Sequence, residues 1–195
     1  MRHAAGCGLP IMAMIRPRAG GFCLDDTDLL IMLADIAVAR QAGLAGVVFG
    51  ALTTDLTLDL PKMSQLCAAA DGMQITLHRA FDLIEDWRRA LDQAVALGVH
   101  RILTSGAALS APAGITRLAE IVDYAAGRIG ILPGAGISAE TAGPLRNLKI
   151  EELHASCSAP VMGDAKSIAF GFASPNARRT DAGKVRALKA VMTGH

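Results

Sequence analysis

The feature that most constrains the fold is a series of short apolar segments that recurs along the chain at intervals of roughly 25 to 35 residues. Helical patterns lie between them. Strand and helix alternating at this spacing are typical of βαβ units, whose strands form a parallel sheet. The expected strands are 11–15, 46–50, 75–77, 101–104, 129–132 and 152–156. No shift in composition marks a boundary, so residues 1–195 are expected to form a single domain.

Five helices are expected, and the first has the clearest pattern. Asp25 and Asp26 mark its start, and its apolar residues follow a helical period until Gly43. The expected ranges are 26–41, 82–97, 115–126, 139–146 and a last helix from Thr180 or Asp181 to about Met192. The stretch 158–179 lacks periodicity and is expected to be a long loop.

Composition limits the classes of partner. The chain is 52% hydrophobic with a mean hydropathy of +0.38, yet no apolar run approaches the roughly 18 residues that cross a bilayer. A net charge of +1 gives no basic footprint for nucleic acid. The four cysteines form no C-x-x-C pair, and no secretory signal precedes them. A reduced, cytoplasmic protein without membrane or nucleic-acid partners is therefore expected.

Each expected strand is apolar through its body and polar or glycine-rich at its C-terminal end. In a parallel α/β protein these ends lie on one face, where ligands bind. We call this group of residues the mouth. Its members are Arg16, Arg18, His78, Arg79, Ser105, Gly134, Gly136 and His154.

Part of the mouth is predicted to bind an anion. Arg16 and Arg79 offer planar forks for a carboxylate or phosphate, and Ser105 ends the strand after Arg79. Gly134 and Gly136 belong to a glycine loop that is expected to open a helix, with free backbone N–H groups. The alternatives are ion pairs for the arginines and a tight turn without a ligand for the glycines.

His78 and His154 are the catalytic candidates, because a histidine at a strand end can act as acid, base or metal ligand. Hydrogen-bonded structural histidines are the alternative. Asp82 is expected to be a helix N-cap rather than to orient a neighbour. Cys23 and Cys157 both follow strand ends, so a soft-metal site is considered there, against buried or incidental thiols.

Several motifs occur together in an order that resembles the CutC family of copper homeostasis proteins. They are MIRPRAGGFC, GVVFGALTTDLTLD, LHRAFD, RILTSG, ILPGAGIS, ELHAS and TDAGKVRALKAVM, from about Met12 to Met192. The resemblance implies a cytoplasmic TIM-type (β/α)8 barrel, often a dimer or larger oligomer, associated with copper tolerance and Cu(I) binding. It places Arg16, His78, Arg79, Ser105 and His154 at the polar mouth of the family's barrel.

The chain departs from the family pattern at its start. Two family strands, ending in Glu-Val-Cys and Glu-Leu-Cys, have no counterpart here, so the expected fold is an incomplete barrel of about six βα units. Six strands with the tilt and shear of an eight-stranded barrel do not close into a barrel. The strands 11–15 and 152–156 are therefore left as apolar edges. A misassigned start or truncated gene is favoured over completion by a partner chain or a smaller closed sheet.

Three functions follow from these observations. The leading one is binding or handling of copper ions, with Cu(I) as the ligand. The second is an enzyme or binding protein for a small anionic metabolite at the mouth, since arginine and histidine suit phosphate or carboxylate better than Cu(I). The third is a truncated barrel fragment without function of its own.

Overall fold

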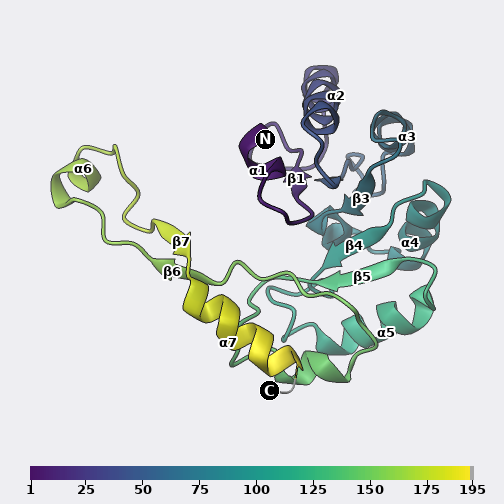
Figure 1. The fold of residues 1–195 in the computed structure, drawn as a ribbon. Helices are drawn as coiled ribbons and strands as arrows, with labels where there is room; N and C mark the ends of the chain where they lie inside the picture. Colours follow the sequence, from purple (N-terminus) through teal and green to yellow (C-terminus); the bar gives the residue numbers. More distant parts are fainter. Residues whose placement is uncertain (194–195) are drawn as a thin grey trace.

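Five short strands form one parallel sheet whose order, β1-β2-β3-β4-β5, follows the chain. The computed structural model describes residues 1–193. The strands are β1 (Met12–Met14), β2 (Gly46–Phe49), β3 (Gln74–Leu77), β4 (Arg101–Thr104) and β5 (Gly130–Pro133). The connections carry α2 (Asp26–Gln41), α3 (Leu60–Ala69), α4 (Trp87–Ala96) and α5 (Ile115–Ala125). These helices follow the outer side of the sheet in an arc (Figure 1), which confirms the incomplete (β/α) barrel.

The strands bury the side chains that face the helices. Side chains alternate along a strand, so every second residue points outward to the helix layer. These outward residues belong to the main hydrophobic cluster: Val47, Phe49, Ile75, Leu77, Ile102 and Ile131. The residues between them point to the inner face of the sheet, where Met14 is 55% exposed. The core therefore lies between the sheet and α2–α5, and the inner face is more open.

Helix α2 matches its expected range at both ends. Asp25 accepts a hydrogen bond from the backbone N–H of Asp28, and the Asp28 carboxylate accepts one from the backbone N–H of Asp25. This capping box satisfies two N–H groups that a helix start leaves free. Beyond the last turn, Gly43 adopts φ +72°, a conformation that favours glycine.

The sixth expected strand is shorter than predicted. Of residues 152–156, only His154 pairs with the sheet, through a parallel bridge to Gly134 and an N–H donated to the Pro133 carbonyl at 2.9 Å. Glu151 and Glu152 precede it and are exposed, because two adjacent carboxylates cannot enter a buried strand without partners. The sheet thus ends at β5 plus one bridge.

Three helix predictions need correction. Helix α4 begins at Trp87 rather than residue 82, because 79–83 form the 3₁₀ helix η1 (Arg79–Leu83) and Asp86 caps α4. The range 139–146 contains no α-helix; only the 3₁₀ helix η2 (Gly143–Asn147) forms there, with Pro144 in its first turn. Helix α3 was not predicted, although Asp59 caps it through the N–H of Lys62.

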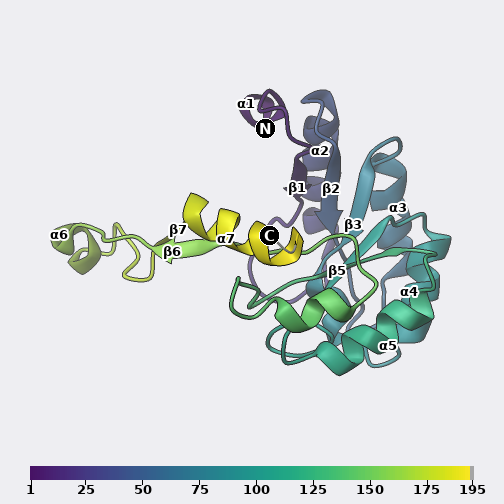
Figure 2. The same cartoon turned by 60° about the horizontal axis from the view of Figure 1, so that its bottom comes forward.

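The expected loop 158–179 is a structured arm. β6 (Ser158–Pro160) and β7 (Arg178–Thr180) pair antiparallel, with α6 (Ala165–Ala169) between them. Both views show this arm projecting away from the rest of the molecule (Figures 1 and 2).

The two ends of the chain add a helix each. After the arm, α7 (Ala182–Thr193) begins where Asp181 accepts the Lys184 N–H, and its Leu188 packs in a second cluster with Leu145. Helix α1 (Arg2–Ala5) lies near the N-terminus. No helix within residues 1–193 is long and apolar enough to cross a membrane.

Candidate functional site

The C-terminal ends of β1, β2 and β3 place Arg16 and His78 on the inner face. Met14 pairs with Val48 in the register of β1 and β2, so Arg16 and Gly50, two residues further along, point to the same face. A Cβ on Gly50 would lie 2.7 Å from Nδ1 of His78. The His78 ring therefore leans over Gly50, into space that any larger residue would fill.

His78 is 4% exposed and is held as a neutral imidazole. The backbone N–H of Ala80 donates to Nδ1 at 3.2 Å, which assigns the ring proton to Nε2. Burial, with a smaller contribution from the positive charge of Arg16, lowers the pKa of His78 to about 4. Every fully buried side-chain nitrogen or oxygen in the described chain has a hydrogen-bond partner. Nε2 makes no hydrogen bond to residues 1–193 and is not among the fully buried atoms, so it is left as a slightly exposed neutral donor.

Arg16 carries a charge that no carboxylate of residues 1–193 neutralises. Its Cζ lies 4.6 Å from the centroid of the Phe22 ring, and that ring lies 4.8 Å from the His78 ring. One nitrogen, Nη2, donates to the Gly20 carbonyl at 2.6 Å. Among the ion pairs of residues 1–193, none includes Arg16. The guanidinium is therefore oriented by Phe22 and Gly20 and has donors left for a ligand.

Arg18 has a structural role instead. Its Nε donates to both oxygens of Asp28 at 3.1 and 2.9 Å, and its Nη2 donates to the Cys23 carbonyl. The hydrogen bond from Arg18 lowers the pKa of the Asp28 carboxyl. This clamp ties the loop after β1 to the first turn of α2.

Asp82 organises the other half of the mouth. Its carboxylate accepts from the hydroxyl of Thr104, from the N–H and hydroxyl of Ser105, and from the N–H of Ala107. It also pairs with Nε of Arg79 at 2.7 Å. The prediction of a helix N-cap is therefore wrong: Asp82 joins the loop after β3 to the loop after β4.

The same network occupies two residues predicted to bind an anion. Arg79 donates through Nη2 to the Ser105 hydroxyl at 2.8 Å and to the Ala108 carbonyl at 3.2 Å. Ser105 is fully buried, and its hydroxyl lies within hydrogen-bond distance of Asp82 and of the Ala108 carbonyl, to one of which its single proton is donated. Partners within the protein therefore satisfy most of the hydrogen-bonding capacity of Arg79 and Ser105.

The glycine loop after β5 is explained by packing. A Cβ on Gly134 would lie 2.5 Å from Cδ1 of Leu103, and one on Gly136 would lie 2.7 Å from Cβ of Ser110. The Gly134 N–H donates to the Thr104 carbonyl. Since no α-helix follows this loop, it lacks the helix N-terminus on which the anion prediction relied.

The remaining predicted residues lie apart in the fold. His154 is exposed beside Gly134. Cys23 is exposed in the loop after β1, whereas Cys157 packs against the second cluster, and both thiols are free. Within residues 1–193, no group of three or more His, Cys, Asp or Glu side chains is placed to hold a metal ion.

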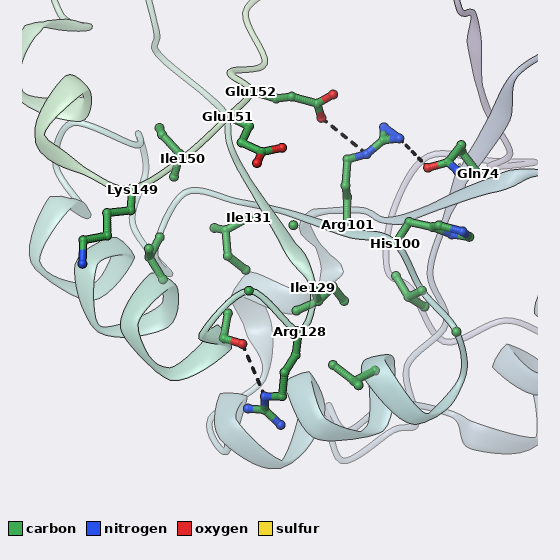
Figure 3. Close-up of a pocket in the computed structure, with 17 residues that line it drawn as sticks. Gln74, His100, Arg101, Arg128, Ile129, Ile131, Lys149, Ile150, Glu151 and Glu152 are labelled. Carbon is green, nitrogen blue, oxygen red and sulfur yellow. Dashed lines mark hydrogen bonds and ion pairs between the residues drawn. The ribbon is translucent and has the colours of Figure 1, made fainter.

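A pocket of about 610 Å³ opens at the opposite end of the strands. Gln74, Arg101 and Gly130 line it, and these are the first residues of β3, β4 and β5. Figure 3 shows Arg101 between Gln74 and Glu152. Arg101 donates a hydrogen bond to the side-chain oxygen of Gln74 at 2.8 Å and forms an ion pair with Glu152 at 3.4 Å. In parallel α/β folds ligands bind at the carboxyl ends of the strands, so we assign the candidate site to the mouth.

Comparison with known proteins identifies the family. The CutC family model matches residues 1–159. The chain belongs to the CutC family. A family protein CutC of Sinorhizobium medicae is 50% identical over 186 residues, covering 94% of this chain and 76% of the relative. One from Rhizobium meliloti is 48% identical over 192 residues, covering 97% and 78%.

Solved structures agree with the CutC fold. CutC of Streptococcus agalactiae, named for copper homeostasis, superposes with a TM-score of 0.72 at 34% identity, covering 75% of this chain and 72% of that one. KGPDC of Streptococcus mutans has a TM-score of 0.60 at 14% identity, covering 98% and 76%. The second likeness concerns the fold alone.

Sequence reasoning missed three residues of this CutC chain that lie beside the candidate site or on the inner face of β1. Phe22 contacts both Arg16 and His78. The only sign of this role in the sequence is its position directly after a glycine pair and close to two arginines. Met12 and Met14 alternate on β1 and so share the inner face. The pattern M-x-M within an expected strand is enough to find them.

Proposed function

We propose that this chain binds and handles copper, with Cu(I) as its cargo. The observation that carries the proposal is membership in the CutC family, whose relative in Streptococcus agalactiae is named for copper homeostasis. Cu(I) prefers thiolate and thioether ligands. A copper site in this chain therefore needs sulfur donors that can reach one another.

β1 and the loop after it supply three sulfur atoms as candidates. Met12 and Met14 present thioethers on the inner face, and Cys23 is an exposed free thiol nine residues after Met14. Cys157, which is partly buried, is the other candidate. Since no described cluster of His, Cys, Asp and Glu could hold the ion alone, thioethers are the donors that would complete the site.

An anaerobic competition titration against a Cu(I) chelator tests this proposal. We expect one Cu(I) per chain, and roughly tenfold weaker binding, about 1.4 kcal/mol, in Cys23→Ser and in the double variant Met12→Leu/Met14→Leu. Met162→Leu is the matched control, since Met162 is 98% exposed on the arm. Equal Cu(I) affinity in the wild type and in the variant that combines Cys23→Ser, Met12→Leu and Met14→Leu would exclude a copper site on these three residues.

A second candidate function is binding of a small anion at the mouth. The observation that favours it is the unpaired guanidinium of Arg16, which lies near a neutral imidazole donor. A thermal-shift screen of phosphates and carboxylates tests this candidate. We expect stabilisation that Arg16→Ala removes; a screen without any stabilising anion would refute it.

We further propose that residues 1–195 form one domain that acts in the cytoplasm as a homodimer. All four cysteines are free, as expected in a reducing compartment. β1 lies at an edge of the sheet, where a second chain could pair with it.

A further inference from the structure

We propose that the mouth binds a short carboxylic acid that carries a second, neutral oxygen, such as a 2-oxo or 2-hydroxy acid, between Arg16 and His78. This inference rests on the anion-binding candidate above and specifies its ligand class and its residues. It follows from the kinds of donor that the mouth leaves free, and from their spacing.

The two free donors differ in charge. The Arg16 guanidinium is always positive, and its planar fork matches the two oxygens of a carboxylate. The Nε2–H of His78 belongs to a neutral ring, so it suits a carbonyl or hydroxyl oxygen rather than a second negative charge. A ligand that satisfies both has one anionic and one neutral acceptor group.

The spacing of the strands favours two acceptor groups over one. Arg16 follows β1 and His78 follows β3, with β2 between them, so their backbones lie about 10 Å apart. The His78 ring leans over Gly50 toward β1, and Phe22 borders both side chains. Both side chains therefore contact the same aromatic ring, and the positive charge of Arg16 lies near enough to act on the His78 ring. We infer that one molecule of a few carbon atoms bridges them.

Phosphate fits these residues less well. The glycine loop after β5 is not followed by an α-helix, and the Gly134 N–H is bonded to Thr104. Arg79, the other arginine of the anion prediction, is paired with Asp82. A phosphate dianion would meet one free guanidinium and one neutral donor, whereas phosphate sites usually combine several N–H groups with positive charge.

Calorimetric titration of the full chain tests the ligand class. The probes are pyruvate, lactate, acetate and inorganic phosphate at pH 7.5 and constant ionic strength. We expect pyruvate or lactate to bind at least fivefold more tightly than acetate and phosphate. Arg16→Gln should weaken pyruvate binding at least tenfold. Arg40→Gln, an exposed arginine in the last turn of α2, should leave it unchanged.

A second measurement reports on His78 without a substitution at a buried position. In ¹⁵N-histidine spectra at pH 6, the His78 ring is assigned through its correlations to the backbone, and its low pKa keeps it neutral. Its Nε2 resonance should move on addition of pyruvate. If acetate binds as tightly as pyruvate and the resonance does not move, the second acceptor is excluded.

The outcomes separate this inference from the function on which it rests. Tighter binding of phosphate than of pyruvate, lost in Arg16→Gln, would overturn the carboxylate class and keep the anion candidate. Failure of all four probes to bind would overturn both.

Discussion

Asp82 is the residue on which the shape of the mouth depends most. Asp82→Ala would leave the buried Thr104 hydroxyl and the backbone N–H of Ser105 without their acceptor. Unsatisfied buried groups cost about 1–3 kcal/mol each, so we expect a loss of roughly 2–4 kcal/mol in the free energy of unfolding by urea. Asp86→Ala, which removes only a helix cap, should cost about 1 kcal/mol. Equal losses in the two variants would contradict the role given to Asp82.

Burial of His78 makes stability depend on pH. Its folded pKa of about 4 lies below the ordinary value of 6.5, so between these values the unfolded chain binds a proton that the folded chain does not. The contribution is therefore complete above pH 6.5 and is lost as pH falls toward 4, by about 3 kcal/mol.

Urea unfolding at pH 7 and pH 5 measures this effect. Both proteins share the same carboxylates, so loss of stability from carboxylate titration is common to both. Only the wild type carries the buried histidine, so His78→Gln should lose less stability than wild type between the two pH values. An identical loss in both proteins would show that His78 is not held neutral by burial.

The sequence predicts single residues well where one strand decides their place. Arg16 and His78 reach the expected face because strand alternation fixes it. It does not show the partners of Asp82, which lie at the end of β4 and in the loop after it. Nor does it show the hydrogen bond between Arg79 and Ser105, which depends on how two loops meet. Side-chain pairing across loops is not encoded in local periodicity.

At the scale of elements, the arm from β6 to β7 is the least anchored part of the fold. α6 has no buried residue, and β7 is exposed along its length. Phe170 and Phe172 are 68% and 86% exposed. Segments with few buried contacts open at low free-energy cost. In hydrogen exchange, we expect residues 161–177 to exchange within seconds, while β2 and β3 remain protected.

Protection of the arm in that experiment would contradict the account of a free arm and would indicate that another chain covers it. Repeating the exchange at several protein concentrations distinguishes these cases, because cover by a second chain increases with concentration.

Elements with their own start and stop signals were predictable. α2 has a capping box and a C-terminal glycine, and its range is correct. The range 139–146 fails because Pro144 prevents a regular helix. The prediction of a strand at 152–156 fails because the adjacent glutamates favour solvent. The apolar residues that suggested the strand give no sign of this preference.

At the scale of the whole molecule, the open sheet bears on association. Its inner face carries the half-exposed Met14, and β1 lies at an edge. Light scattering after size exclusion should give the mass of two 20.2 kDa chains. Met14→Lys on that face should shift the mass toward one chain. A wild-type monomer at micromolar concentration would contradict the proposed dimer.

We propose that this CutC-family chain carries Cu(I) on sulfur ligands. Copper X-ray absorption of anaerobically loaded, desalted protein tests it most directly. We expect about one retained copper per chain with sulfur atoms in its first shell, and loss of those scatterers in the variant that lacks Met12, Met14 and Cys23. Copper lost on desalting, or a first shell of nitrogen and oxygen alone, would contradict it.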